Sequence, residues 1–202
     1  FGNNDIDAGH RIVSAQDGGF LLAGSSNSSA GGDKSESTRG GMDFWIIKID
    51  SNGAKQWDKS IGGSQNENFR SAIPLADGGF LLAGSSDSVV SGEKTQGTQG
   101  GEDFWVVKID ANGNVVWDKT LGGTASDRAR SLAVTADGNY LIAGFSESGQ
   151  GGDKTEASRG QKDFWAIKMD PNGNKLWDKT LGGSNDDVVT SVRSTPDGGS
   201  LL

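Results

Sequence analysis

The chain has 202 residues, only 33% of them hydrophobic, with 33 glycines, no cysteine and a formal net charge of −8. This composition predicts many short elements joined by turns, and it excludes disulfides, thiolate nucleophiles and cysteine-based zinc sites. We expect no nucleic-acid partner, because the acidic sequence has no basic cluster, and no membrane span, because no apolar run approaches the ~20 residues that a helix needs.

The sequence repeats with a period of 60 residues. Shifted by 60 places it aligns without a gap, so that Phe20, Phe80 and Tyr140 fall in register. We divide the single segment 1–202 into three full repeats, 1–60, 61–120 and 121–180, and a partial fourth, 181–202. The fourth repeat stops inside a predicted strand. We therefore expect part of a longer array, whose remaining repeats belong to the same or to another chain.

Each repeat contains four predicted strands. In the second repeat these are, approximately, Arg70–Leu75, Phe80–Ser85, Asp103–Asp110 and Asn114–Leu121. The third strand has apolar residues at alternate positions on both sides, which predicts that both of its faces are covered.

Two tight turns join these strands. In Asp170-Pro171-Asn172-Gly173 the proline suits the second position of a type I turn, and the glycine suits the left-handed position that follows. The turn between the first two strands has the same pattern, as in Thr195-Pro196-Asp197-Gly198. The predicted structural glycines are therefore Gly53, Gly113, Gly173, Gly78, Gly138 and Gly198.

The third and fourth strands form a hairpin written three times, first as DFWIIKIDSNGAKQWDK, Asp43–Lys59. If Asp50 pairs with Ala54, the register puts Trp45 and Trp57 on one face of the hairpin, and Lys48 diagonal to Asp58 on the other. We expect the tryptophans to pack between repeats rather than to stack on sugars. They are Trp45, Trp57, Trp105, Trp117, Trp165 and Trp177.

Four antiparallel strands per repeat, with repeats stacked face to face, predict an all-β fold, a segment of a larger β-propeller. A period of 60 exceeds the ~40–50 residues usual for propeller repeats, and the excess lies in the long loops 25–42, 85–102 and 145–162. A β-solenoid is the alternative. It would require parallel coils and shorter repeats.

The stretch LGGTASDRARSLAVTADGNYLIAGFSES, Leu121–Ser148, resembles the bacterial β-propeller repeat of secreted and cell-surface proteins. The other repeats match the same outline, but the long loop and the DFW triplet depart from it. The resemblance implies a propeller blade in an extracellular or surface-anchored bacterial protein. It supplies no catalytic residues.

Functional residues on such a scaffold are expected in the loops. Strand alternation places the long loops and the Gly-Gly loops between repeats on one rim, the candidate binding face for a protein or glycan. Two sets of acids there are candidate calcium ligands: Asp33, Glu93 and Asp153, and Asp43, Asp103 and Asp163. The alternative is that the first set caps turns and pairs with Lys34, Lys94 and Lys154, while the second set begins a strand.

Further acids and the single histidine have simpler interpretations. Asp7, Glu67, Asp127 and Asp187 are expected to accept hydrogen bonds from backbone donors in the Gly-Gly loops. His10 aligns with Arg70, Arg130 and Thr190, and we expect an ordinary surface residue.

The sequence therefore predicts a non-catalytic, extracellular repeat segment that serves as a binding, adhesion or structural module, without a required cofactor. The alternative function is part of a carbohydrate-active propeller enzyme whose active-site blades lie outside this chain.

Overall fold

The computed structural model describes residues 1–2 and 5–202, which form an all-β structure without a helix. The first sheet contains β1 (Asp7–Ser14), β2 (Phe20–Ser26), β3 (Asp43–Ile49) and β4 (Lys55–Ile61). The second contains β5 (Glu67–Pro74), β6 (Phe80–Ser86), β7 (Asp103–Ile109) and β8 (Val115–Leu121). The third contains β9 (Asp127–Val134), β10 (Tyr140–Ser146), β11 (Asp163–Met169) and β12 (Lys175–Leu181). A two-stranded ribbon follows, β13 (Arg193–Ser194) and β14 (Ser200–Leu201).

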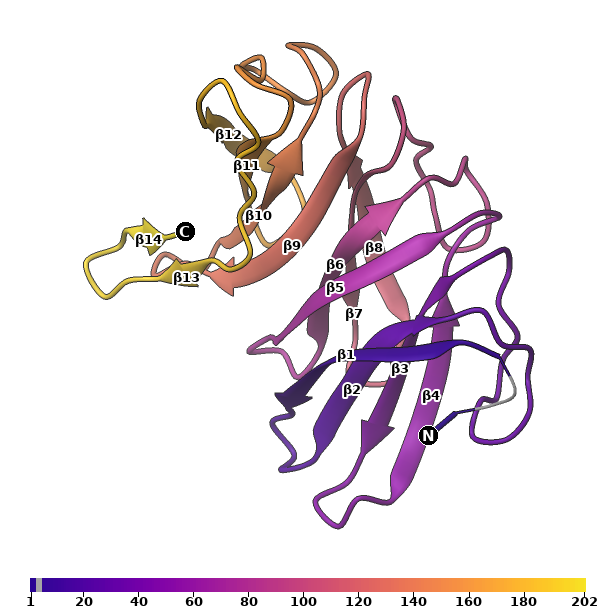
Figure 1. Cartoon of the computed structure of the whole chain (residues 1–202). Coiled ribbons are helices and arrows are strands. Elements are labelled where there is room, and N and C mark those ends of the chain that lie inside the picture. The colour runs from indigo at the N-terminus through magenta and orange to yellow at the C-terminus, as the bar shows by residue number, and fades with distance from the viewer. Residues whose placement is uncertain (3–4) are drawn as a thin grey trace.

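Each sheet is a simple antiparallel meander in which every strand pairs with the next one in sequence. The sheets follow one another face to face, with the first strands β1, β5 and β9 in contact and β13 next to β9 (Figure 1). All strand pairs are antiparallel, which excludes the parallel coils of a solenoid for the described residues. The predicted strands agree with β5–β8 to within one residue, except that β5 begins at Glu67, three residues before Arg70.

The predicted turns are confirmed. Gly53 and Gly78 have φ angles of 85° and 84°, and the equivalent turn glycines in the other repeats are also left-handed. Asp50 accepts a hydrogen bond from the Gly53 N–H at 3.1 Å and donates its own N–H to Ala54 at 2.9 Å, as a type I turn with a glycine bulge requires. The Asp50 side chain also accepts from Asn52 and Ala54, which explains an aspartate at the start of the turn.

The predicted register of the long hairpin is wrong by one residue. Ile49 pairs with Lys55, but Lys48 pairs with Trp57, so Gln56 is the extra residue of a second bulge. Because a one-residue slip moves a side chain to the opposite face, Trp45 and Trp57 lie on opposite faces of the sheet. Lys48 does not approach Asp58. It forms an ion pair with Asp17 of the neighbouring turn at 2.7 Å.

The core lies between consecutive sheets. Phe44 of the first sheet packs against Trp105 of the second, with tilted rings whose centroids are 5.0 Å apart, and Phe104 packs against Trp165 in the same way at 4.9 Å. Trp57 lies on the other edge of the first interface and covers the turn glycine Gly113. Five of the tryptophans are buried or half-buried, whereas Trp177 is 41% exposed on the outer face of the third sheet.

Candidate functional site

The long loops and the Gly-Gly loops lie on one rim, as predicted. Asp153 in the third long loop donates its N–H to the Gly122 carbonyl at 2.8 Å, and its carboxylate accepts from the Gly122 N–H at 3.2 Å. The two tight turns of each sheet meet at the opposite rim, where Lys48 binds Asp17 and Lys108 binds Asp77, each at 2.7 Å.

Each long loop is fastened to the last strand of its own sheet. The Trp105 indole N–H donates to the Asp118 carboxylate at 2.9 Å, and the same carboxylate accepts from the Thr95 N–H at 3.1 Å. The first and third sheets repeat this arrangement at Asp58 and Asp178. All three tryptophans therefore hold a long loop, and Trp105 and Trp165 also fill the interfaces between sheets.

The loop lysines are structural. Lys94 is 1% exposed, its ammonium lies 5.5 Å from the Trp105 ring centroid, and it donates a hydrogen bond to the Thr120 hydroxyl. Burial lowers the pKa of Lys94 to about 8. Lys34 and Lys154 lie over Trp45 and Trp165 in the same way. The alternative in which these lysines pair with Asp33, Glu93 and Asp153 is therefore wrong.

The first set of candidate calcium ligands joins adjacent repeats. Glu93 accepts from the Gly62 N–H at 3.1 Å and forms an ion pair with Arg39 of the preceding repeat at 2.5 Å. Asp153 accepts from the side chain of Gln99, which occupies the position equivalent to Arg39, at 2.6 Å. Asp33 is exposed and accepts from the Gly2 N–H at 3.2 Å.

The second set is buried at the starts of the third strands. Asp43, Asp103 and Asp163 are 0% exposed, and one oxygen of each accepts a backbone N–H, as from Gln99 at 2.6 Å. The other oxygen of each has no hydrogen-bond partner. Burial, reinforced by the charge of Glu67, raises the pKa of Asp43 to about 6, and burial together with Asp127 raises that of Asp103 to about 7.

Glu67, Asp127 and Asp187 accept backbone hydrogen bonds in the Gly-Gly loops, as predicted. Glu67 accepts from the Gly63 N–H, Asp127 from Gly123 and Asp187 from Gly183, each at 2.7 Å, and Asp7 accepts from the Ser28 hydroxyl at 3.1 Å. Glu67 and Asp43 approach the same side of Gly62, so a side chain at this glycine would displace both carboxylates. Across residues 1–2 and 5–202, no three His, Cys, Asp or Glu side chains are grouped as metal ligands.

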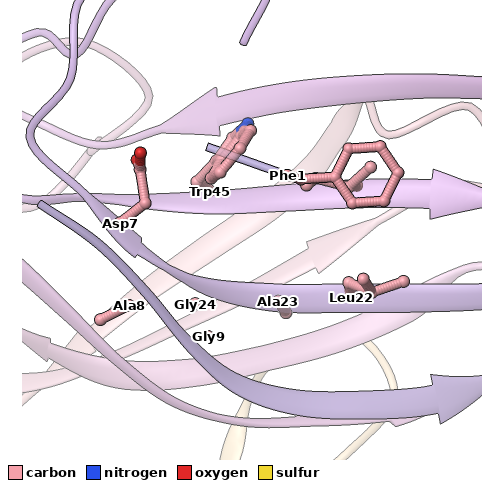
Figure 2. A pocket seen from close by; sticks show the side chains of 9 residues that line it. Phe1, Asp7, Ala8, Gly9, Leu22, Ala23, Gly24 and Trp45 are labelled. Atoms are coloured by element: carbon pink, nitrogen blue, oxygen red, sulfur yellow. The ribbon is translucent and has the colours of Figure 1, made fainter. Parts of the chain in front are cut away.

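The outer face of the first sheet contains a hollow of about 120 Å³. Figure 2 shows the side chains of Phe1, Leu22 and Trp45 around it. The equivalent residues of the second sheet, Leu82 and Trp105, are covered by the first sheet. No helix among the described residues has the length and apolarity needed to span a bilayer.

The arginines on the first strands form a group that the sequence pattern does not predict. The alignment of His10 with Arg70 and Arg130 shows that each repeat has a basic residue at this position. It does not show that the three side chains lie near one another. His10 is exposed, as predicted, and its ring lies 6.4 Å from that of Phe69.

No protein-family model matches the chain. The regulatory protein FlaEY of Caulobacter vibrioides is 26% identical over 163 residues, an alignment that covers 76% of this chain. The matched part is 17% of the length of that protein.

Proposed function

We propose that this chain is a segment of a β-propeller and serves as a non-catalytic binding, adhesion or structural module of a secreted or surface-attached bacterial protein. The repeated junction between sheets is the observation that supports the propeller. Phe44–Trp105 and Phe104–Trp165, together with Arg39–Glu93 and Gln99–Asp153, join successive sheets through equivalent residues.

The two end sheets carry the separate halves of this junction. The first sheet exposes Asp33 and surrounds a hollow with Trp45, while the third carries Arg159 and Phe164 at the complementary positions. In our proposal, further repeats of the same kind cover both faces and complete the propeller. A structure of the chain with an additional repeat at each end would test this. The added sheets should repeat the Phe–Trp contact.

The binding role is proposed for the tips of the long loops. The charged residues shared by the loops hold each loop to its strand or to the next repeat, whereas the tips differ between repeats. Val89 and Val90 are 60% and 64% exposed, and their equivalents are Ser29-Ala30 and Gly149-Gln150. A rigid base with variable tips is the usual arrangement of a binding surface.

A glycan array and a pull-down with the full chain test the binding role. The variant Val89→Ser/Val90→Ala gives the second loop the tip of the first, so it should fold normally and lose a ligand specific to the second loop. Binding that is unchanged in this variant would place the ligand elsewhere. Hydrolysis of a polysaccharide, abolished by one carboxylate substitution, would overturn the non-catalytic assignment in favour of the enzyme alternative.

A further inference from the structure

Arginines are concentrated on the first strands of the sheets, although the chain as a whole is acidic. The chain has seven arginines, and two of them, Arg39 and Arg159, lie in the long loops. The other five lie on β1, β5, β9 and β13, the strands that follow one another across Figure 1. They are Arg11, Arg70, Arg128, Arg130 and Arg193.

A bulge in each first strand places the central residues of this group. The pairing of β5 with β6 passes from Phe69 directly to Ser71, so Arg70 is the extra residue, and His10 and Arg130 occupy the same position in β1 and β9. The bulge is possible because the facing residue of the second strand is glycine. A side chain at Gly84 would collide with the Asn68 carbonyl. We call His10, Arg70 and Arg130 the bulge row.

The charges in the bulge row are close enough to repel one another. Burial, with the Arg70 charge as the second cause, lowers the pKa of His10. Burial, followed by the charges of Arg70 and Arg128, lowers the pKa of Arg130. Arg130 lies over the Phe145 ring at 5.3 Å, and its Nε is buried without a hydrogen-bond partner. The positive charges of the bulge row therefore lie close enough together to destabilise one another.

No carboxylate of the described residues forms an ion pair with the bulge row, although the charge of Glu102 acts on Arg130. Among the ion pairs of the described residues, Arg128 binds Glu102, but His10, Arg70 and Arg130 are in none, nor are Arg11 and Arg193. At the rim of the tight turns, by contrast, the Lys48 ammonium is paired with the Asp17 carboxylate. A set of cations that lacks acidic partners on an acidic protein indicates a site for an external anion.

A groove of about 200 Å³ crosses the four first strands, and its lining begins at the residues that directly follow the bulge row, Arg11, Ser71 and Ser131. Arg11 and Arg193 lie at its two ends, and Ser71 and Ser131 lie between them. The Ser71 hydroxyl accepts from the Leu132 N–H at 3.3 Å and the Ser131 hydroxyl from the Val192 N–H at 3.1 Å. Each hydroxyl hydrogen therefore remains free to donate to a ligand oxygen.

We propose that the bulge row and this groove bind a small polyanion, a molecule that carries two or more carboxylate, phosphate or sulfate groups. Guanidinium groups bind such oxyanions through paired, charge-assisted hydrogen bonds. A compact ligand is favoured over a long polyanion, because the net charge of −8 on the chain would repel the rest of a polymer. The proposal goes beyond the loop-tip function and does not depend on it.

Titration calorimetry of the full chain with pyrophosphate and with citrate, at constant ionic strength, tests the proposal. Saturable binding is expected for at least one of them, and the stronger one distinguishes a phosphate ligand from a carboxylate ligand. The variants Arg70→Thr and Arg130→Thr introduce the residue that the chain has at position 190, so folding should be preserved. Each is expected to weaken binding roughly tenfold or more.

The matched control is Arg159→Gln, which removes the same charge from a long loop and introduces the residue found at the equivalent position 99. It should leave the affinity unchanged, whereas Thr190→Arg, which adds an arginine at the aligned position just before β13, should increase it. Absence of saturable binding, or equal weakening by Arg159→Gln and Arg70→Thr, would overturn the proposal. Unfolding curves of each variant report folding independently of the anion.

Discussion

Two turn glycines with the same backbone conformation should respond differently to the same substitution. Gly53 and Gly113 have φ angles of 85° and 82°, so alanine at either position must adopt a left-handed conformation that costs about 1–2 kcal/mol. Their surroundings differ. A Cβ atom at Gly53 would have no neighbour within 4 Å, whereas one at Gly113 would lie 2.9 Å from the Trp57 ring of the preceding repeat.

The difference between the variants measures the contact between sheets. An overpacked site of this kind costs a further ~1–3 kcal/mol, so Gly113→Ala should destabilise by about 2–5 kcal/mol and Gly53→Ala by about 1–2 kcal/mol. Urea unfolding followed by tryptophan fluorescence gives both values. Equal loss of stability in the two variants would show that Trp57 does not bear on the Gly113 turn, and would refute the assignment of the interface.

Three further predictions concern single repeats. Gly113→Val should destabilise far more than Asn114→Ala, because only the first forces a β-branched residue into left-handed space, and comparable melting temperatures would contradict this. Asp118→Asn should cost about 1–3 kcal/mol in urea unfolding, because it weakens the carboxylate that holds both Trp105 and Thr95; a stability equal to that of the unmodified chain would count against this anchor. Stability should fall as the pH rises from about 4 to about 7, because Asp43 and Asp103, with folded-state pKa values of about 6 and about 7, retain protons that the unfolded chain has released. The lowered pKa of His10 opposes this trend near its ordinary value of 6.5. Asp103→Asn should flatten the pH profile, and an unaltered slope would exclude Asp103 as its source.

The sequence predicted the turns well because a turn is determined by a few adjacent residues. Gly113 follows Asp110 by three places, and that spacing alone requires a left-handed glycine. The hairpin register depends on more. Gln56 forms a second bulge directly after the first, and no residue in or near it has a distinctive preference for a bulge. The bulge is favoured by the packing of Trp57 on the next sheet, which lies 56 residues away at Gly113.

The candidate site was less predictable because its important contacts cross between repeats. Asp33, Glu93 and Asp153 are recognisable as loop acids, but their partners lie in the preceding repeat. The lysine that follows each acid turns inward over a tryptophan. The orientation of Lys94, for example, depends on the buried Trp105 indole and on the Thr120 hydroxyl, which lie further along the chain. The bulge row depends on glycines of the second strands, which the sequence shows only as part of an apolar strand.

Repeats nevertheless contain information about their own junctions. Where the rim position holds Arg39, the acid of the following repeat is Glu93, and where it holds Gln99, the acid is Asp153. Both junctions therefore join a side chain of one repeat to an acid of the next, as an ion pair at the first and as an amide-to-carboxylate hydrogen bond at the second. Gln99→Arg should therefore form a new ion pair with Asp153. Because the pair lies at an exposed rim, the gain in the free energy of unfolding should be at most about 1 kcal/mol and should disappear at high salt.

Urea unfolding at low and high ionic strength measures this gain. The control is Arg159→Gln, because Arg159 has no carboxylate of a following repeat as its partner within the described residues. A stabilisation of Gln99→Arg that persists in salt would have to come from packing rather than charge, and would contradict the junction inferred here.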